Sequence, residues 1–170
     1  MLEKLISGGQ TGADRAALDT AIHFAFPHGG WCPKGRIALD GVLGLQYQLH
    51  ETPNADYSQR TRWNIRDSDA TVVFTMKAKP GTGSKLTIKL AEKLGKPCIH
   101  IVLMERTDYQ DPVLILQRFV TEHQVKVLNV AGSRASENEA GIYEAVTAVL
   151  RRAFFFSADQ PGLLAGAGEG

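Results

Sequence analysis

The sequence of 170 residues has little cysteine, which excludes a small scaffold held together by disulfides. Its two cysteines, Cys32 and Cys98, have no CxxC spacing and indicate a reducing compartment. The sequence also lacks a charged-then-apolar leader and any apolar run of about 18 residues. We therefore expect a soluble, cytoplasmic protein with no membrane partner.

An excess of one charge is missing as well, since 19 Lys and Arg against 18 Asp and Glu give a net charge of +1. This balance does not indicate a protein built around a polyanion. Aromatic residues make up only 8% of the chain and are scattered, which argues against a base-stacking surface. The five histidines show no ligand spacing. We expect neither a nucleic-acid partner nor a metal site.

What the sequence does have is a regular alternation of apolar, β-branched runs with longer stretches of helical spacing. Strands are predicted at 4–7, 71–74, 98–103 and 125–130, and helices at 13–24, 57–66, 85–94, 113–123 and 137–155. The alternation predicts an α/β fold, a single doubly wound domain with a mainly parallel sheet flanked by helices. This domain spans residues 1–156. Residues 157–170 are a Gly- and Ala-rich tail, which we expect to lie against a neighbouring subunit or a groove of the same chain.

Two glycine-rich turns each follow a predicted strand and precede a helix. The first is residues 7–13 (SGGQTGA), and the second is residues 81–84 (GTGS). A helix N-terminus has unpaired N–H groups and a positive dipole end, and glycine lets the backbone approach an anion closely. Neither turn matches a P-loop or GxGxxG pattern. A single such turn is as readily structural, but two turns at the same sheet edge favour phosphate or nucleotide binding.

Cationic residues lie between the two turns. Lys34 and Arg36 flank Gly35 in a short loop, and Arg60 and Thr61 share one predicted helix. Arginine suits bidentate contacts to phosphate oxygens, so we interpret these cations as ligand contacts, although a solvated basic face is the alternative.

The start of the first helix carries two adjacent charges. Asp14 complements the helix dipole, whereas Arg15 does not, and Arg15 could simply pair outward with Asp19. Cys32 is a weak candidate nucleophile because no histidine is adjacent in sequence. His100 and Cys98 are expected to be core residues.

Several of these stretches together resemble the molybdenum-cofactor carrier family. This family is also described as a circularly permuted, Rossmann-like branch of a nucleotide-ligand-binding superfamily. The resemblance covers roughly residues 4 to 150 and rests on 8–15 (GGQTGADR), 30–36 (GWCPKGR), 51–52, Tyr57, Arg60, Thr61, Asn64, 68–69 and 81–87 (GTGSKLT).

The resemblance implies a Rossmann-like domain, a phosphate-bearing ligand over the glycine-rich turns, and a homo-oligomer, either dimer or tetramer. For a carrier the ligand is the molybdenum cofactor (molybdopterin), whose terminal phosphate suits these donors; otherwise it is a nucleotide. The implied ligand contacts are Gly8, Gly9, Gln10, Thr11, Gly12, Ala13, Asp14, Arg15, Lys34, Gly35, Arg36, Arg60, Thr61, Gly81, Thr82, Gly83, Ser84 and Thr87.

One departure from the superfamily favours binding over catalysis. The related lysine-decarboxylase-like phosphoribohydrolases carry a Pro-Gly-Gly-x-Gly-Thr turn and a glutamate three residues after its threonine. Here the turn is one residue shorter, and Thr87 stands nearest to that glutamate. Threonine cannot transfer a carboxylate's proton. We therefore predict a carrier with no catalytic residue.

Two alternatives to the carrier stay open. One is a nucleotide N-glycosidase with Asp14 as its only candidate carboxylate, and the other is a ligand-sensing regulatory module. We also expect Gly9→Val to abolish binding and to leave the fold intact, because a Cβ would block the approach of the backbone to a ligand.

Overall fold

Five parallel strands form the central sheet, in the order β2-β1-β9-β7-β8. The computed structural model describes residues 1–104, 111–136 and 139–156. The strands are β1 (Lys4–Ile6), β2 (His28–Gly29), β7 (Ala70–Thr75), β8 (Cys98–Val102) and β9 (Val127–Gly132). This arrangement confirms the mainly parallel, doubly wound sheet that the sequence predicts.

The strand β7 is at the centre of the core. All six of its residues are buried, and it pairs with β8 on one side and with β9 on the other. Its β-branched run suits a strand that is covered on both faces, because such side chains pack well on a pleated surface.

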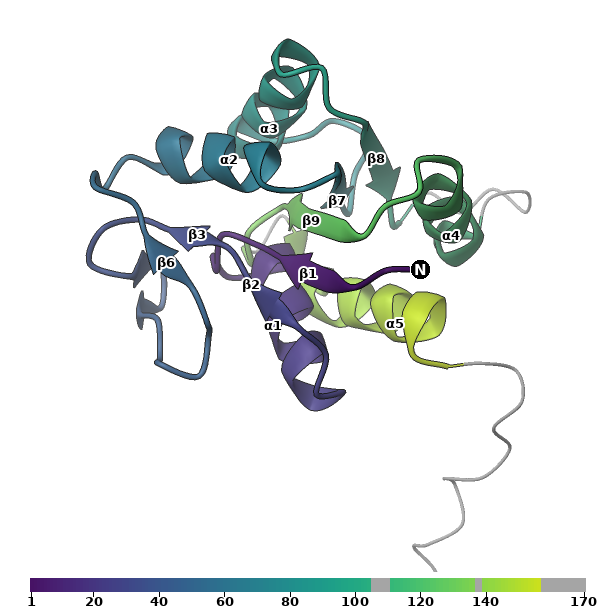
Figure 1. Ribbon diagram of the computed structural model, residues 1–170, viewed down its shortest axis with the longest axis horizontal. Coiled ribbons are helices and arrows are strands. Elements are labelled where there is room, and N and C mark those ends of the chain that lie inside the picture. Colours follow the sequence, from purple (N-terminus) through teal and green to yellow (C-terminus); the bar gives the residue numbers. More distant parts are fainter. Residues whose placement is uncertain (105–110, 137–138, 157–170) are drawn as a thin grey trace, which may run out of the picture.

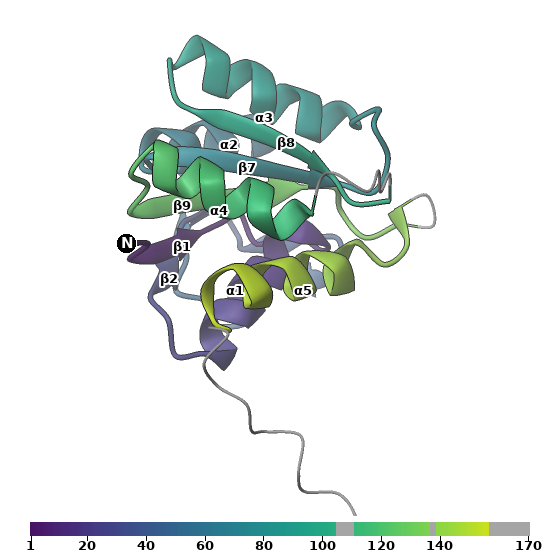
Figure 2. The same ribbon diagram turned by 90° about the vertical axis from the view of Figure 1, so that its right-hand side faces the viewer.

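Helices cover both faces of the sheet (Figures 1 and 2). The core on one face is formed with α1 (Ala13–His23), α4 (Pro112–Glu122) and α5 (Ile142–Phe154). On the opposite face, α3 (Thr82–Lys93) packs against the sheet and α2 (Tyr57–Arg66) packs against α3. Figure 2 shows α3 above the sheet and α1 with α5 below it.

Two helix starts differ from the sequence prediction. The last helix begins at Ile142 and not at 137, because Gly141 precedes it in a left-handed conformation with φ of 80°. The helix α3 begins at Thr82, three residues earlier than predicted, and Gly81 is its N-cap. The second glycine-rich turn is therefore the first turn of α3 itself.

Residues 31–52 form a small lobe beside the sheet, which we call the β3–β6 lobe. It contains a parallel pair, β3 (Trp31–Cys32) with β6 (His50–Glu51), and an antiparallel pair, β4 (Ile37–Ala38) with β5 (Gly41–Val42). With Leu18 of α1 it encloses a second hydrophobic cluster, made of Cys32, Ala38, Leu43, Tyr47 and Leu49. Burial raises the pKa of the Cys32 thiol, which disfavours a nucleophilic role.

Arg36 holds this lobe together. Its guanidinium donates to four backbone carbonyl oxygens over 2.9–3.1 Å, those of Leu43, Gly44, Tyr47 and Leu49. Its backbone has φ of 55°, a conformation that non-glycine residues rarely adopt. The contacts favour a structural role for Arg36.

None of the helices in the described ranges is long and apolar enough to cross a membrane. The predicted tail, 157–170, lies outside the described residues, so its proposed contact with a subunit or groove stays a prediction.

The Arg36 contacts yield a first prediction. Arg36→Lys keeps the charge but loses the planar fork, so the free energy of unfolding should fall by about 2 kcal/mol. Urea unfolding measures this change, with Lys34→Ala in the exposed part of the same loop as the control. A variant of unchanged stability that loses ligand affinity would instead make Arg36 a ligand contact.

Candidate functional site

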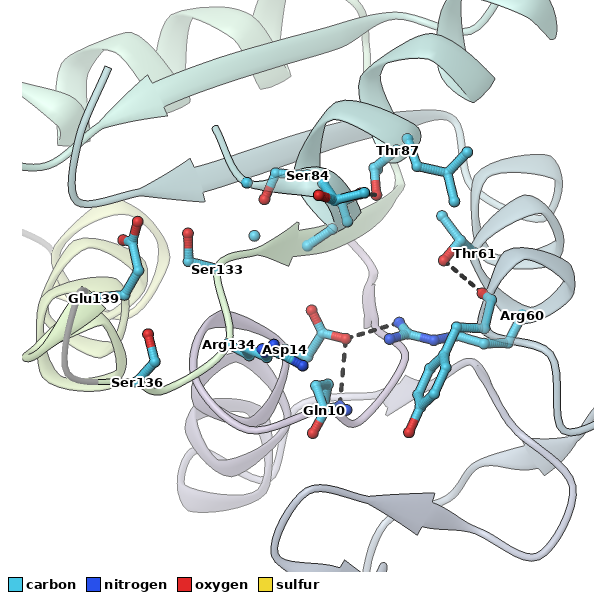
Figure 3. Close-up of a pocket in the computed structure, with 17 residues that line it drawn as sticks. Gln10, Asp14, Arg60, Thr61, Ser84, Thr87, Ser133, Arg134, Ser136 and Glu139 are labelled. Carbon is cyan, nitrogen blue, oxygen red and sulfur yellow. Dashed lines mark hydrogen bonds and ion pairs between the residues drawn. The ribbon is translucent and has the colours of Figure 1, made fainter. Parts of the chain in front are cut away.

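A cavity of about 490 Å³ opens at the carboxyl ends of β1, β9 and β7, three adjacent strands (Figure 3). This is where doubly wound sheets bind their ligands. Loops and helix starts from all three strands contribute to it, together with α2. The lining residues are Gln10, Asp14, Tyr57, Arg60, Thr61, Gly81, Thr82, Gly83, Ser84, Leu86, Thr87, Ala131, Gly132, Ser133, Arg134, Ser136 and Glu139.

The first glycine-rich turn already holds an anion, the carboxylate of Asp14. Its Oδ2 accepts hydrogen bonds from Nη1 of Arg60 at 2.9 Å and from the N–H of Gln10 at 3.4 Å (Figure 3). The N–H of Gly8 also stabilises the carboxylate. The turn therefore donates to Asp14, a carboxylate of its own helix, hydrogen bonds that could otherwise bind a phosphate.

Other N–H groups of this turn are occupied too. Gly9 donates to Oγ of Ser7 over 3.4 Å, and Thr11 donates to Oε1 of Gln10 over 2.9 Å. The N–H of Ala13 donates to the carbonyl of Ser133 over 3.1 Å. Because these donors are satisfied within the protein, the start of α1 has less to offer an external anion than its sequence indicates.

The glycines of this turn make room for protein groups. A Cβ at Gly8 would collide with the Arg60 guanidinium. Gly9 has φ of 77°, and a Cβ there would lie 2.8 Å from Cδ1 of Leu43 and 2.9 Å from Cδ1 of Leu49. This glycine faces the β3–β6 lobe, so the structure now predicts that Gly9→Val strains the fold, contrary to the expectation from the sequence.

Asp14 and Arg60 form a buried ion pair, with 6% and 13% of their side chains exposed. Burial raises the pKa of Asp14 above the ordinary aspartate value, while Arg60 and the backbone donors oppose that rise. In the part of the chain that the structure describes, Nε of Arg60 is buried with no hydrogen-bond partner. This unpartnered donor lies close to Gly8, where a Cβ would come within 2.9 Å of it.

The second glycine-rich turn is open. Gly81 caps α3 without a side-chain hydrogen bond, and a Cβ at Gly81 or Gly83 would meet no described atom within 4 Å. No described residue accepts a hydrogen bond from the N–H of Thr82, Gly83 or Ser84. Ser84 and Thr87 are buried on the cavity side of this helix. The N–H groups of Thr82, Gly83 and Ser84 are therefore free donors at the N-terminus of α3.

The structure thus brings together half of the predicted contacts. Those that line the cavity are Gln10, Asp14, Arg60, Thr61, Gly81, Thr82, Gly83, Ser84 and Thr87. Those that do not line it are Gly8, Gly9, Thr11, Gly12, Ala13, Arg15, Lys34, Gly35 and Arg36.

Arg15 and Gly35 are engaged elsewhere. Arg15 pairs with Asp40 at 2.9 Å and donates to the carbonyl of Gly9, so the suggested pairing with Asp19 is wrong. Asp40 comes from the loop between β4 and β5 and is brought close only by the fold. The N–H of Gly35 donates to Oε2 of Glu51 over 2.5 Å.

Sequence reasoning missed the loop after β9. Ser133, Arg134, Ser136 and Glu139 line the cavity opposite Arg60 and Thr61 (Figure 3). The signal was present, because residues 131–141 (AGSRASENEAG) are a third Gly- and Ser-containing stretch between a strand and a helix. The inference that Asp14 is the only carboxylate of the site is therefore wrong, since Glu139 is a second one.

No histidine or cysteine is among the described residues that line the cavity. Within residues 1–104, 111–136 and 139–156, no cluster of three His, Cys, Asp or Glu side chains is placed to hold a metal ion. His100 is hydrogen-bonded to Oγ1 of Thr75 at 2.7 Å, and burial lowers its pKa. Burial raises the pKa of Cys98 to about 11. We infer structural roles for both.

Comparison with known proteins agrees with the motifs. A family model described as the circularly permutated YpsA SLOG family matches residues 5–154. The chain belongs to this family. The family resemblance drawn from the motifs is thereby confirmed.

A solved structure is also similar to this family member. It is the 1.45 Å crystal structure of a protein named "Putative molybdenum carrier protein" from Syntrophus aciditrophicus SB. The two chains are 45% identical, the match covers 90% of this chain and 95% of the other, and the TM-score is 0.84. No curated protein matches the sequence.

The Asp14–Arg60 pair predicts a pH-dependent stability defect. Arg60→Ala leaves Asp14 buried without its cation, which raises the pKa of Asp14 further in the folded state. A folded-state pKa above the unfolded one stabilises the fold at low pH, and this stabilisation is lost as pH rises through the folded value. The variant should therefore be close to the parent protein near pH 4 and less stable by about 3 kcal/mol at neutral pH.

Urea unfolding from about pH 4 to pH 8 measures this difference. In the Asp14→Asn background the same arginine substitution removes no carboxylate interaction, so the added pH dependence should vanish. A defect of Arg60→Ala that is equal at every pH would contradict the ionic pairing.

Gly9 gives a separate prediction. Gly9→Val forces a branched side chain against Leu43 and Leu49 at a positive φ, so it should destabilise the protein by about 2 kcal/mol or more. Thermal unfolding measures the loss, and Gly83→Val, which enters open space, is the matched control. Equal stability of the two variants would show that the lobe does not pack on this turn.

Proposed function

We propose that this protein is a carrier of a phosphate-bearing pterin of the molybdenum-cofactor type, held in the cavity with its phosphate at the N-terminus of α3. The observation that carries the proposal is the open start of this helix. Its first N–H groups, the hydroxyls of Thr82 and Ser84 and the positive dipole end all adjoin the cavity.

The remaining lining supports an anionic ligand. Two arginines line the cavity, Arg60 from α2 and Arg134 from the loop after β9. A volume of about 490 Å³ lies within the range of small-molecule pockets. The name of the similar Syntrophus protein favours a molybdenum-related cargo over a free nucleotide.

The proposal extends to the cellular location and the oligomeric state of the carrier. Two free cysteines suit a cytoplasmic location. A homo-oligomer stays a prediction that light scattering tests.

A nucleotide N-glycosidase is the second candidate, because two carboxylates, Asp14 and Glu139, line the cavity. Burial raises the pKa of Asp14, as in many general acids. Against this candidate, Thr87 is the residue nearest to the position of the glutamate in the related hydrolases, and its Oγ1 donates to the carbonyl of Gly83 over 3.1 Å. Release of a free base from a nucleotide by the parent protein, and none by Asp14→Asn, would support the enzyme.

Mass spectrometry of the compounds that copurify with the protein tests the carrier directly. A phosphorylated pterin is the expected result, and adenine nucleotides alone would count against it. Added at 100 times its Kd, such a ligand should raise the free energy of unfolding by about 2.7 kcal/mol. Absence of any thermal shift with phosphorylated pterins and nucleotides would overturn the proposal in favour of a regulatory interaction module whose ligand site is vestigial.

The helix start allows binding to be separated from folding. Gly83→Leu places a side chain in open space at the cavity wall, so the protein should be at least as stable, because leucine favours a helix over glycine by about 0.8 kcal/mol. Affinity for a phosphorylated ligand should nevertheless fall about tenfold or more, because the side chain covers the phosphate donors. Calorimetric titration measures it.

Lys89→Ala is the control for this helix, since Lys89 is exposed on α3 away from the cavity lining. It should bind like the parent protein. Unchanged affinity in Gly83→Leu would show that the phosphate does not bind at the start of α3.

A further inference from the structure

The cavity has two chemically different ends. In Figure 3, Arg60 lies on one side and Glu139, with Ser133 and Ser136, on the other, while Ser84 of the α3 start lies between them. A carboxylate attracts N–H groups and repels phosphate. Although Arg134 comes from the same loop, Glu139 itself favours a ligand that presents N–H donors to it and keeps its phosphate at the α3 start.

The carboxylate of Glu139 is held in place by backbone. Its Oε2 accepts a hydrogen bond from the N–H of Met76 over 2.8 Å. Met76 follows directly after β7, and its carbonyl accepts a hydrogen bond from the N–H of Met104 over 3.1 Å. The acceptor is thus fixed to the end of the central strand, which is the kind of preorganisation that a specific contact needs.

This anchoring leaves acceptor capacity for a ligand. Each carboxylate oxygen can accept two hydrogen bonds, and the Met76 bond uses only one of these sites. The hydroxyls of Ser133 and Ser136 beside it can donate or accept, so they tolerate several ring atoms. The carboxylate discriminates between ring edges at this end, because it accepts hydrogen bonds and does not donate them.

We propose that Glu139 selects the ring of the ligand by binding the adjacent N–H groups of a 2-amino-4-oxopyrimidine edge, the unit that pterins and guanine share. This inference rests on the proposed function and names its specificity residue. Two neighbouring donors on that edge match the acceptor lone pairs of a carboxylate. Adenine has a ring nitrogen with a lone pair beside its amino group. The negatively charged carboxylate repels this lone pair.

Nucleoside monophosphates test the ring preference at constant phosphate chemistry. The probes are GMP, IMP, which lacks the 2-amino group, AMP, and 6-hydroxymethylpterin phosphate, titrated calorimetrically into the 170-residue chain. GMP and the pterin phosphate should bind about tenfold or more tightly than AMP, with IMP between them. Tighter binding of the pterin than of GMP identifies the pterin as the source of the shared edge, and the reverse identifies a guanine nucleotide.

Glu139→Gln is the decisive variant, because its amide oxygen still accepts from Met76 while its NH₂ group cannot accept from the ring. It should lose about tenfold in affinity for GMP and the pterin phosphate and change little for AMP. Glu144→Gln removes the same charge from an exposed position in the first turn of α5 and should bind every probe like the parent protein.

The outcomes separate this inference from the proposed function. Equal affinity for GMP, IMP and AMP, or an equal loss for all three in Glu139→Gln, overturns the role of Glu139 and leaves a phosphate-binding carrier. No binding of any phosphorylated probe overturns the proposed function and this inference with it.

Discussion

The ion pair between Asp14 and Arg60 is the constraint on which the rest of the site depends. It joins the start of α1 to α2, two helices on opposite faces of the sheet, across the end of β1. Both side chains are largely buried, so loss of either would leave an uncompensated charge. The pair fixes the guanidinium against Gly8, which is why a side chain is not accommodated there.

Further polar pairs extend this tie into the walls of the site. Asn64 of α2 exchanges two hydrogen bonds with the backbone of Trp31, and so holds the β3–β6 lobe against this helix. Asp19 of α1 accepts from the hydroxyls of Tyr47 and Tyr143, which come from the lobe and α5. Burial, followed by the bond to Asp19, raises the pKa of Tyr143 to about 12, so it stays a donor at physiological pH.

This division leaves the two glycine-rich turns with different tasks. The first turn uses the N–H groups of Gly9, Gln10 and Thr11 within the protein and joins α1, α2 and the lobe. The second turn keeps its donors free at the cavity. A helix start with free donors suits reversible binding of an anion, because an anion could enter and leave without rearrangement of the core.

The sequence alone determined the main helices and strands of this protein, because the spacing of its apolar residues is a local property of the chain. The helix α2 was predicted with the bounds that it has, Tyr57–Arg66, and the family was identified from the motifs around it. Local pattern also placed both glycine-rich turns at one edge of the sheet, since carboxyl ends of parallel strands meet there.

Only the tertiary structure decided which of these donors remain free. Gly9 faces Leu43 and Leu49, and the guanidinium of Arg36 donates hydrogen bonds to four carbonyl oxygens of its own lobe. Glu139 joins the site through Met76, which is 63 residues away in the sequence. A hydrogen bond between residues so distant leaves no periodic trace in the chain, so the partner of each polar group was fixed only by folding.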